Sequence, residues 1–152
     1  MQRVFEARVS FQDRTTFEQR SAKYVDGMAQ LMLEEVDKGD VVILGRGAGV
    51  IMAEDRRLFR VHLVADLDTR IKRIASERKL RGSKGLDEAR RLCNESDYAR
   101  TAFHQYLFNV DWNSPLIYEL ALNTSDMTLD QASEIILKAF EIVRGTNLRC
   151  DD

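Results

Sequence analysis

The chain has 152 residues, of which 44% are hydrophobic and 32% are charged, and its formal net charge is -2. This length suits a single domain over residues 1–152 that buries about two-thirds of its unfolded surface, and the composition excludes a disordered protein. The small net charge gives no reason to expect a nucleic acid polymer as a partner, and no apolar run approaches the roughly 20 residues of a membrane span.

Two elements are predicted in the first part of the chain. Alternating apolar residues over Phe5–Phe11 favour a half-buried strand. Thr15 and Glu18 form a capping-box pattern, which predicts the start of a helix, and Lys38 with Gly39 provides its end. The apolar side of this helix would carry Phe17, Tyr24, Val25, Met28, Met32 and Val36.

A strand and a glycine-rich turn are predicted at Val41–Gly49. Val41–Leu44 holds consecutive apolar residues, mostly β-branched, as in a parallel strand covered on both faces. The turn places Arg46 at the carboxyl end of that strand, where open α/β sheets bind ligands. Because a guanidinium donates two parallel hydrogen bonds, Arg46 with Gly45 and Gly47 is a candidate site for a phosphate or carboxylate. The alternative is a structural glycine turn with a solvated arginine.

A second strand, Phe59–Ala65, leads into a helix that Asp66 or Asp68 can cap. Arg70 and Arg73 lie in the first turns of this helix, which again places cations on the ligand side of the sheet. They are candidates to contact a phosphate, and the alternative is that they belong to a solvated helix face. The apolar side of the helix would carry Leu67, Ile71, Ile74 and Ala75.

A basic stretch with two glycines, Arg81–Gly85, predicts a flexible link before a long helix from Asp87 to about Phe108. On this helix Asp97 and Arg100 have the i, i+3 spacing that places them side by side on one face. There the aspartate would orient the guanidinium and accept a hydrogen bond from a ribose or an amino group. The alternative is a surface ion pair, which contributes only ~0.5 kcal/mol.

The last predicted elements are a short strand near Leu120–Asn123 and a helix that begins at Thr128, with Gln131 completing a capping box. Gly145 ends this helix, and residues 144–152 form a polar tail. Strands that alternate with helices through short links indicate a parallel sheet. We therefore expect an α/β fold of three layers, a parallel sheet with helices on both faces.

The chain has two cysteines, Cys93 and Cys150, and the second lies in the polar tail. This usage argues against a structural disulfide and for a cytoplasmic protein. Neither cysteine has His or Cys neighbours at zinc-ligand spacing, so no metal site is expected. No Gly-x-Ser-x-Gly elbow occurs and no thiol lies beside a candidate base, so the arginines remain as the candidate chemistry.

In their order and spacing, these segments resemble the cytidylate kinase-like family of nucleoside monophosphate kinases, over roughly residues 20 to 143. The resemblance implies the fold of a P-loop nucleoside monophosphate kinase, an acceptor such as CMP, and ATP with Mg²⁺ as cofactors. The segments that carry it are Gly39–Ala48, Arg60–Ala65 with Arg70 and Arg73, Asp97–Arg100, Asp111–Trp112, Tyr118–Thr124 and Met127–Leu129.

The resemblance also implies roles for the candidate residues. Arg46 with its flanking glycines would help to hold the acceptor nucleotide. Arg70 and Arg73 would be catalytic and would face the phosphate in transfer, since that transfer needs cations around its oxygens. Related cytidylate kinases carry an aspartate where this chain has Gly47, which leaves the preferred base open.

A mobile lid is implied at about residues 79–112. The glycines of Gly82–Gly85 would act as its hinge, and its closure would exclude water from the reaction. From this lid Asp97 and Arg100 would reach the acceptor.

No Gly-x-x-x-x-Gly-Lys-Ser/Thr loop occurs in these residues. In the family this loop opens the chain on the central strand of the sheet, so we expect a fold that lacks its first strand. Three arrangements would fill the gap: the Phe5–Phe11 segment, a strand from a partner chain, or direct pairing of Val41–Leu44 with Phe59–Ala65.

Two functions are open at this point. One is a shortened phosphotransferase, weak or inactive as this chain alone, because the lysine and hydroxyl that would hold ATP and magnesium are missing. The other is a non-catalytic nucleotide- or anion-binding or dimerising remnant, in which a second copy covers an open sheet edge. CMP binding, with or without ATP-dependent phosphorylation, separates the two.

Overall fold

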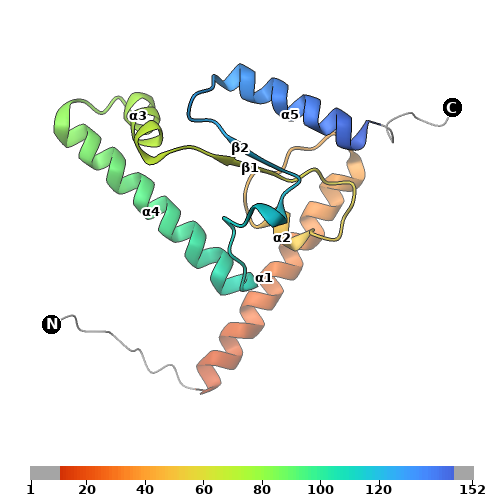
Figure 1. Cartoon of the computed structure of the whole chain (residues 1–152). Helices are drawn as coiled ribbons and strands as arrows, with labels where there is room; N and C mark the ends of the chain where they lie inside the picture. Colours follow the sequence, from red (N-terminus) through yellow and green to blue (C-terminus); the bar gives the residue numbers. More distant parts are fainter. Residues whose placement is uncertain (1–10, 146–152) are drawn as a thin grey trace. The chain divides into compact units, whose positions relative to one another are not determined.

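A computed structural model describes residues 11–145 of the chain, and it has the order of helices and strands drawn in Figure 1. The described residues fall into two compact units, which divide between Ile51 and Met52. The single domain expected from chain length stays a prediction. Residues 5–10 of the predicted first strand and residues 146–152 of the predicted tail lie outside the described residues.

The first unit is built on α1 (Phe11–Lys38), followed by the short α2 (Ala48–Ile51). The predicted apolar side of α1 is confirmed at Met32, which is buried, and at Val25, Met28 and Val36, which are half-buried. Gly39 ends the helix as predicted. Its φ of +78° suits glycine, and its N–H donates to the Val36 carbonyl at 3.0 Å.

Two predictions in this unit are wrong. The capping-box pattern at Thr15 does not start a helix, because α1 is already helical from Phe11, at the end of the predicted first strand. Val41–Leu44 forms no strand, and the side chains of Val42 and Leu44 are 94% and 92% exposed. A β-branched run becomes a strand only where a neighbouring backbone pairs with it, and this segment has no such neighbour among the described residues.

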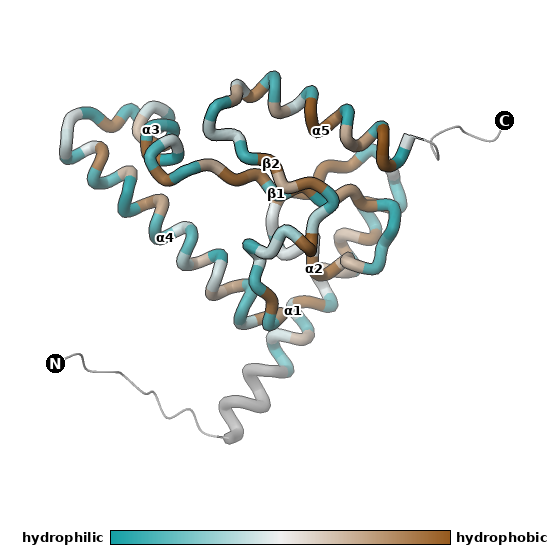
Figure 2. Tube along the Cα trace, viewed as in Figure 1, coloured by the Kyte–Doolittle hydropathy of each residue, from teal (hydrophilic) through white to brown (hydrophobic). Residues whose placement is uncertain are grey.

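The second unit contains the two paired strands of the described residues, β1 (Val61–Val64) and β2 (Leu120–Asn123). They run parallel, with Val61 opposite Leu120 and Val64 opposite Asn123. The α/β class and the parallel pairing are therefore as predicted, whereas the three-layer sheet with helices on both faces is not confirmed. Figure 2 shows the apolar residues that run along these strands.

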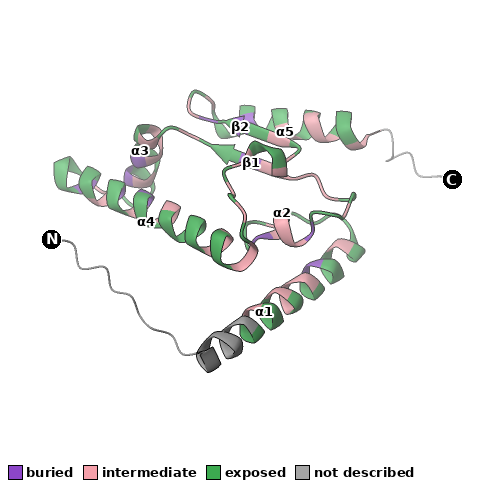
Figure 3. Ribbon diagram, turned by 60° about the horizontal axis from the view of Figure 1, so that its bottom comes forward, coloured by how far each residue is buried: buried purple, intermediate pink, exposed green. Residues whose placement is uncertain are grey.

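The helices α3 (Leu67–Glu77) and α4 (Gly82–Phe108) pack against each other, as Figures 1 and 3 show. Asp66 caps α3, since its side chain accepts a hydrogen bond from the backbone N–H of Thr69 at 2.8 Å. That bond, with others from the side chains of Thr69 and Ser125, lowers the Asp66 pKa to about 2. The contact between the helices is a small apolar core of Ile71, Ala75, Ala89 and Cys93.

The predicted flexible link at Arg81–Gly85 is wrong, because α4 already starts at Gly82 and runs through Gly85 without a break. Gly82, the first residue of α4, has a φ of +68°, which suits glycine. Gly85 is buried, and a Cβ there would lie 2.8 Å from the carbonyl carbon of Leu80. The second glycine therefore permits a close backbone contact at the start of α4, and the predicted lid motion stays a prediction.

A single-turn 3-10 helix (Pro115–Ile117) and β2 lead to α5 (Leu129–Arg144). The predicted capping box is confirmed, with both hydrogen bonds between Thr128 and Gln131 present. α5 contacts β2, and its Phe140 ring meets the Phe59 ring edge-on, 5.7 Å between centroids. Arg144 was predicted to open the polar tail, but it belongs to the last turn of this helix.

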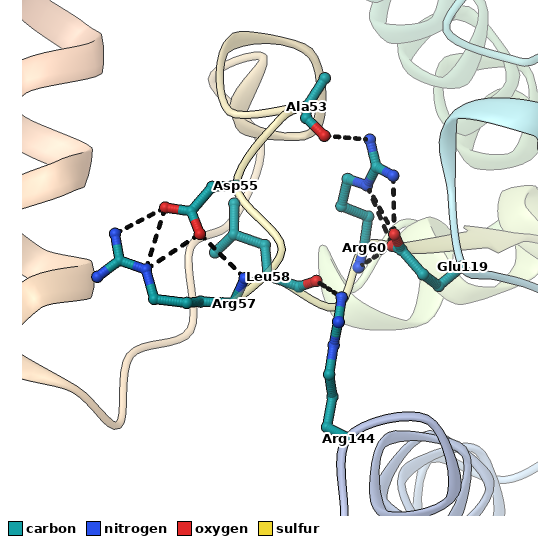
Figure 4. A network of polar contacts seen from close by, with 7 residues as sticks. All are labelled: Ala53, Asp55, Arg57, Leu58, Arg60, Glu119 and Arg144. Carbon is teal, nitrogen blue, oxygen red and sulfur yellow. Dashed lines mark hydrogen bonds and ion pairs between the residues drawn. The ribbon is translucent and has the colours of Figure 1, made fainter. Parts of the chain in front are cut away.

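A polar network ties the amino ends of the two strands together (Figure 4). The Arg60 guanidinium and backbone N–H both donate to the Glu119 carboxylate, with Nη2 at 2.7 Å from Oε1. Burial alone would raise the Glu119 pKa, but these bonds from Arg60 outweigh it and lower the pKa. Arg144 donates to the Leu58 carbonyl and so anchors α5 to the same end.

Candidate functional site

The candidate site begins at the carboxyl ends of the strands, where hydrogen bonds join the residues that follow β1 to those that follow β2. The Val64 carbonyl accepts bonds from the backbone N–H of Thr124 at 2.8 Å and from its hydroxyl at 3.1 Å. The backbone N–H of Asp66 donates to the Ser125 hydroxyl at 2.9 Å. This end of the sheet is therefore closed by fixed loops, which position the first turns of α3.

Arg73, one of the predicted catalytic residues, holds one of these loops. Its Nη1 donates to the Thr124 hydroxyl at 2.9 Å, and its Nη2 donates to the Thr124 carbonyl. Both groups on Thr124 are part-buried, so the guanidinium fixes the segment between β2 and α5. The predicted contact of Arg73 with a phosphate stays a prediction.

Arg70 and Asp97 are brought together by the packing of α3 on α4. Nη1 of Arg70 donates to both carboxylate oxygens of Asp97, at 2.8 and 2.7 Å. Arg100 approaches the same carboxylate, with its Nη1 3.4 Å from Oδ1. Three predicted site residues thus form one cluster, which we call the Asp97 cluster.

The sequence indicated only part of this cluster. Asp97 and Arg100 share a helix face, so their proximity follows from the helical repeat. Arg70 lies on another helix, and no spacing rule relates it to Asp97. The sequence pointed to their proximity only indirectly, because both residues were predicted to belong to one site.

An aromatic cluster that sequence reasoning missed surrounds His62 on β1. The His62 ring stacks on Tyr118 at 4.6 Å and meets Trp112 at 5.2 Å, both between centroids. Burial, and then the nearby charge of Arg100, lower the pKa of His62 below its usual 6.5. Trp112 and Tyr118 pack their loop against His62 of β1, and within the loop the Tyr118 hydroxyl donates to the Trp112 carbonyl at 2.8 Å.

Arg100 joins the aromatic cluster to the Asp97 cluster. Its guanidinium carbon lies 5.6 Å from the centre of the Trp112 ring, a cation–π distance. His104 stacks on the other part of this contact, 5.8 Å from Trp112, and its Nδ1 lies 2.8 Å from the Arg100 carbonyl. The Arg100 side chain is therefore in contact with both Trp112 and Asp97.

Arg46 lies in the first unit, where its side chain is exposed. It has a φ of +59° and stands between Gly45 and Gly47, at +71° and +74°. A left-handed conformation is uncommon for a residue other than glycine, so this turn holds its arginine in a strained backbone. Its predicted role beside the residues of the second unit stays a prediction.

The charges that the structure brings together in the Asp97 cluster suit an anionic ligand. Guanidinium groups converge in the Asp97 cluster, and such groups match phosphate geometry. The glycine turn at residues 45–49 carries no lysine and no hydroxyl side chain, which a triphosphate with its magnesium would need. This turn therefore does not fit ATP with Mg²⁺, and we derive no reaction step through them.

Two findings bear on the absences expected from the sequence. Within residues 11–145, no group of three or more His, Cys, Asp or Glu side chains is placed to hold a metal ion. In the same part of the chain, no helix has the length and apolar character to cross a bilayer.

A parallel α/β unit with arginines gathered beside its helix packing is typical of proteins that handle phosphorylated ligands. The profile of the cytidylate kinase-like family matches residues 2–126, most of the chain. The chain therefore belongs to the cytidylate kinase-like family, which confirms the resemblance found in the sequence.

Similar proteins include a cytidylate kinase of Pyrobaculum aerophilum, 30% identical over 115 residues that make up 76% of this chain and 58% of the relative. A cytidylate kinase of Methanopyrus kandleri is 26% identical over 71% of this chain and 58% of its own length. The chain thus spans less than two-thirds of the length of these relatives.

Among solved structures, an uncharacterized protein from Eubacterium ventriosum superposes with a TM-score of 0.68. The match covers 80% of this chain and 65% of the other, at 20% sequence identity. At this identity the likeness supports a shared fold.

Proposed function

We propose that this chain binds a nucleoside monophosphate, CMP or a close relative, as the acceptor part of a nucleotide phosphotransferase of the cytidylate kinase type. Membership of the family supports a nucleotide kinase-like function. The observation that carries the proposal is the convergence of Arg70 from α3 and Arg100 from α4 on a single carboxylate. Two guanidinium groups aimed at one point suit a phosphate.

The roles of the residues follow from this chemistry. Phosphoryl transfer needs alignment and positive charge around the phosphate oxygens more than covalent help from the protein. Arg70 would face the phosphate, and Arg100 would contact the acceptor, held in place by Trp112. Arg73 would act through the loop at Thr124, which it fixes. Arg46, Gly45 and Gly47 would contact the acceptor nucleotide as well.

As this chain alone, the protein is proposed to transfer phosphate weakly or not at all. ATP with Mg²⁺ would be the donor of an active enzyme, but the lysine and hydroxyl that would hold them are missing from these residues. A cytoplasmic setting and the lack of a nucleic acid polymer as partner remain proposals from composition.

A second candidate is a non-catalytic, dimerising member of the family. Its support is the free edge of β1, which pairs on one side with β2 and on the other with no strand of the described residues. Leu63 and Val64 on β1 are 54% and 39% exposed. Such an edge favours pairing with another chain, so a second copy is the proposed cover.

Calorimetric titration with CMP, and separately with ATP and magnesium, tests the proposal. We expect CMP to bind and ATP to give no heat, and Arg70→Ala to weaken CMP binding by about tenfold or more, the effect of losing a charged hydrogen bond to an anion. Glu88→Gln, an exposed carboxylate change on α4, is the control. Absence of CMP binding at millimolar concentration contradicts the proposal.

A further inference from the structure

Asp97 differs from the other paired carboxylates in the second unit because two arginines share it. Arg60 has Glu119 as a partner, and Arg91 is paired with both Glu88 and Glu95. Arg70 and Arg100, by contrast, have Asp97 as their single carboxylate partner within residues 11–145. The cluster therefore carries an excess of one positive charge.

The hydrogen bonds of Arg70 are also incomplete. A guanidinium has five N–H donors, and Asp97 takes only those of Nη1. Nε of Arg70 is buried and has no hydrogen-bond partner among the described residues. Asp97 thus accepts only some of the hydrogen bonds that the guanidinium group of Arg70 can donate. A ligand with more acceptor oxygens and more negative charge would accept the others.

The helices that carry the cluster are fixed on each other, and all three of its charged side chains are accessible to solvent. Ile71 and Ala89 belong to the core that fixes α3 on α4. The side chains of Arg70 and Asp97 are about one-third exposed, at 32% and 34%, and that of Arg100 is 53% exposed. An anion from solvent therefore has access to the cluster without the helices separating.

We propose that Arg70 and Arg100 form one subsite for a phosphate dianion, and that Asp97 is the internal counter-ion that this phosphate replaces. This inference rests on the proposed function, since it concerns how the same site takes the acceptor phosphate. A dianion with three terminal oxygens interacts more strongly with two cations than a monoanionic carboxylate does. Asp97 offsets one of the two positive charges of the empty subsite, and its side chain moves aside when the ligand enters.

Titration of the full chain with inorganic phosphate and with CMP tests this role of Asp97. Asp97→Asn keeps the side-chain shape but removes the competing charge. We expect it to bind phosphate and CMP about two- to fivefold more tightly than the unaltered chain, the range by which a partly exposed ion pair shifts an equilibrium. If Asp97 instead binds the ligand directly, Asp97→Asn should weaken the binding of phosphate and CMP.

Two variants serve as controls. Glu95→Gln changes the net charge by the same amount on the same helix, at a carboxylate that pairs with Arg91, and we expect unchanged affinity. Arg70→Gln added to Asp97→Asn should abolish the gain, because one of the two cations is then missing. If Asp97→Asn does not fold, Arg100→Gln alone should lower the affinity for phosphate, since it leaves the Arg70–Asp97 pair in place.

The outcomes separate this inference from the proposed function. Equal or weaker binding of both ligands by Asp97→Asn overturns the counter-ion role, even if CMP binds the unaltered chain. Tighter phosphate binding by this variant, with no CMP binding by any variant, supports the subsite and overturns the proposed function. Absence of binding of either ligand to every variant overturns both.

Discussion

At the scale of single residues, His62 is a buried imidazole whose surroundings favour its neutral form. Its pKa is lowered first by burial and then by Arg100. The unfolded chain therefore binds a proton between pH 6.5 and the lowered pKa, and the folded chain does not. The stabilisation by neutral His62 is complete above pH 6.5 and is lost as the pH falls through this window.

We expect the free energy of unfolding to decrease as the pH is lowered from about 7.5 to about 5, and His62→Gln to remove this part of the decrease. Urea denaturation followed by fluorescence of Trp112, the single tryptophan, measures it. His104→Gln, which alters the other histidine beside Trp112, should keep the decrease. The prediction is contradicted if the free energy of unfolding depends on pH equally in the unaltered chain and in His62→Gln.

At the scale of secondary-structure elements, Gly85 shows how packing can oppose helix propensity. Propensity alone predicts that alanine stabilises a helix interior by about 1 kcal/mol relative to glycine. In α4, however, a Cβ at this position lies 2.8 Å from the backbone carbon of Leu80. With alanine at this position, the start of α4 would have to move away from the turn that precedes it.

Gly85→Ala should therefore lower the free energy of unfolding by about 1–3 kcal/mol, the usual cost of an overpacked contact. Gly27 in α1 provides the matched control, since a Cβ there meets nothing within 4 Å. Gly27→Ala should stabilise its helix by up to about 1 kcal/mol. Chemical denaturation followed by circular dichroism measures both variants, and an unchanged or more stable Gly85→Ala would contradict the close contact with Leu80.

At the scale of the whole molecule, the free edge of β1 makes self-association a testable property. If a second copy covers this edge, Leu63→Lys should yield a monomer, because a charged side chain on an edge strand opposes pairing. Leu137→Lys, an exposed leucine of α5, is the control and should keep the oligomer. Light scattering during size-exclusion chromatography measures the mass, and a monomeric unaltered chain at all concentrations contradicts the dimerising alternative.

Local signals of the sequence predicted local features of the structure. The cap at Asp66 and the capping box of Thr128 and Gln131 depend on residues within one turn of each other, and both are confirmed. The predictions for Val41–Leu44 and Arg81–Gly85 were wrong for one shared reason. Whether an apolar run pairs as a strand, or a glycine lies in a tight contact, depends on which segment lies beside it.

The same distinction applies to the candidate site. The sequence by itself determined that Asp97 and Arg100 share a helix face, and that the chain belongs to a nucleotide kinase-like family. Only the tertiary structure decided that Arg70 pairs with Asp97 and that Arg73 is fixed to Thr124. Helical periodicity relates residues one or two turns apart, whereas these contacts cross 27 and 51 residues and exist because an apolar core holds α3 against α4 and hydrogen bonds hold the loop after β2.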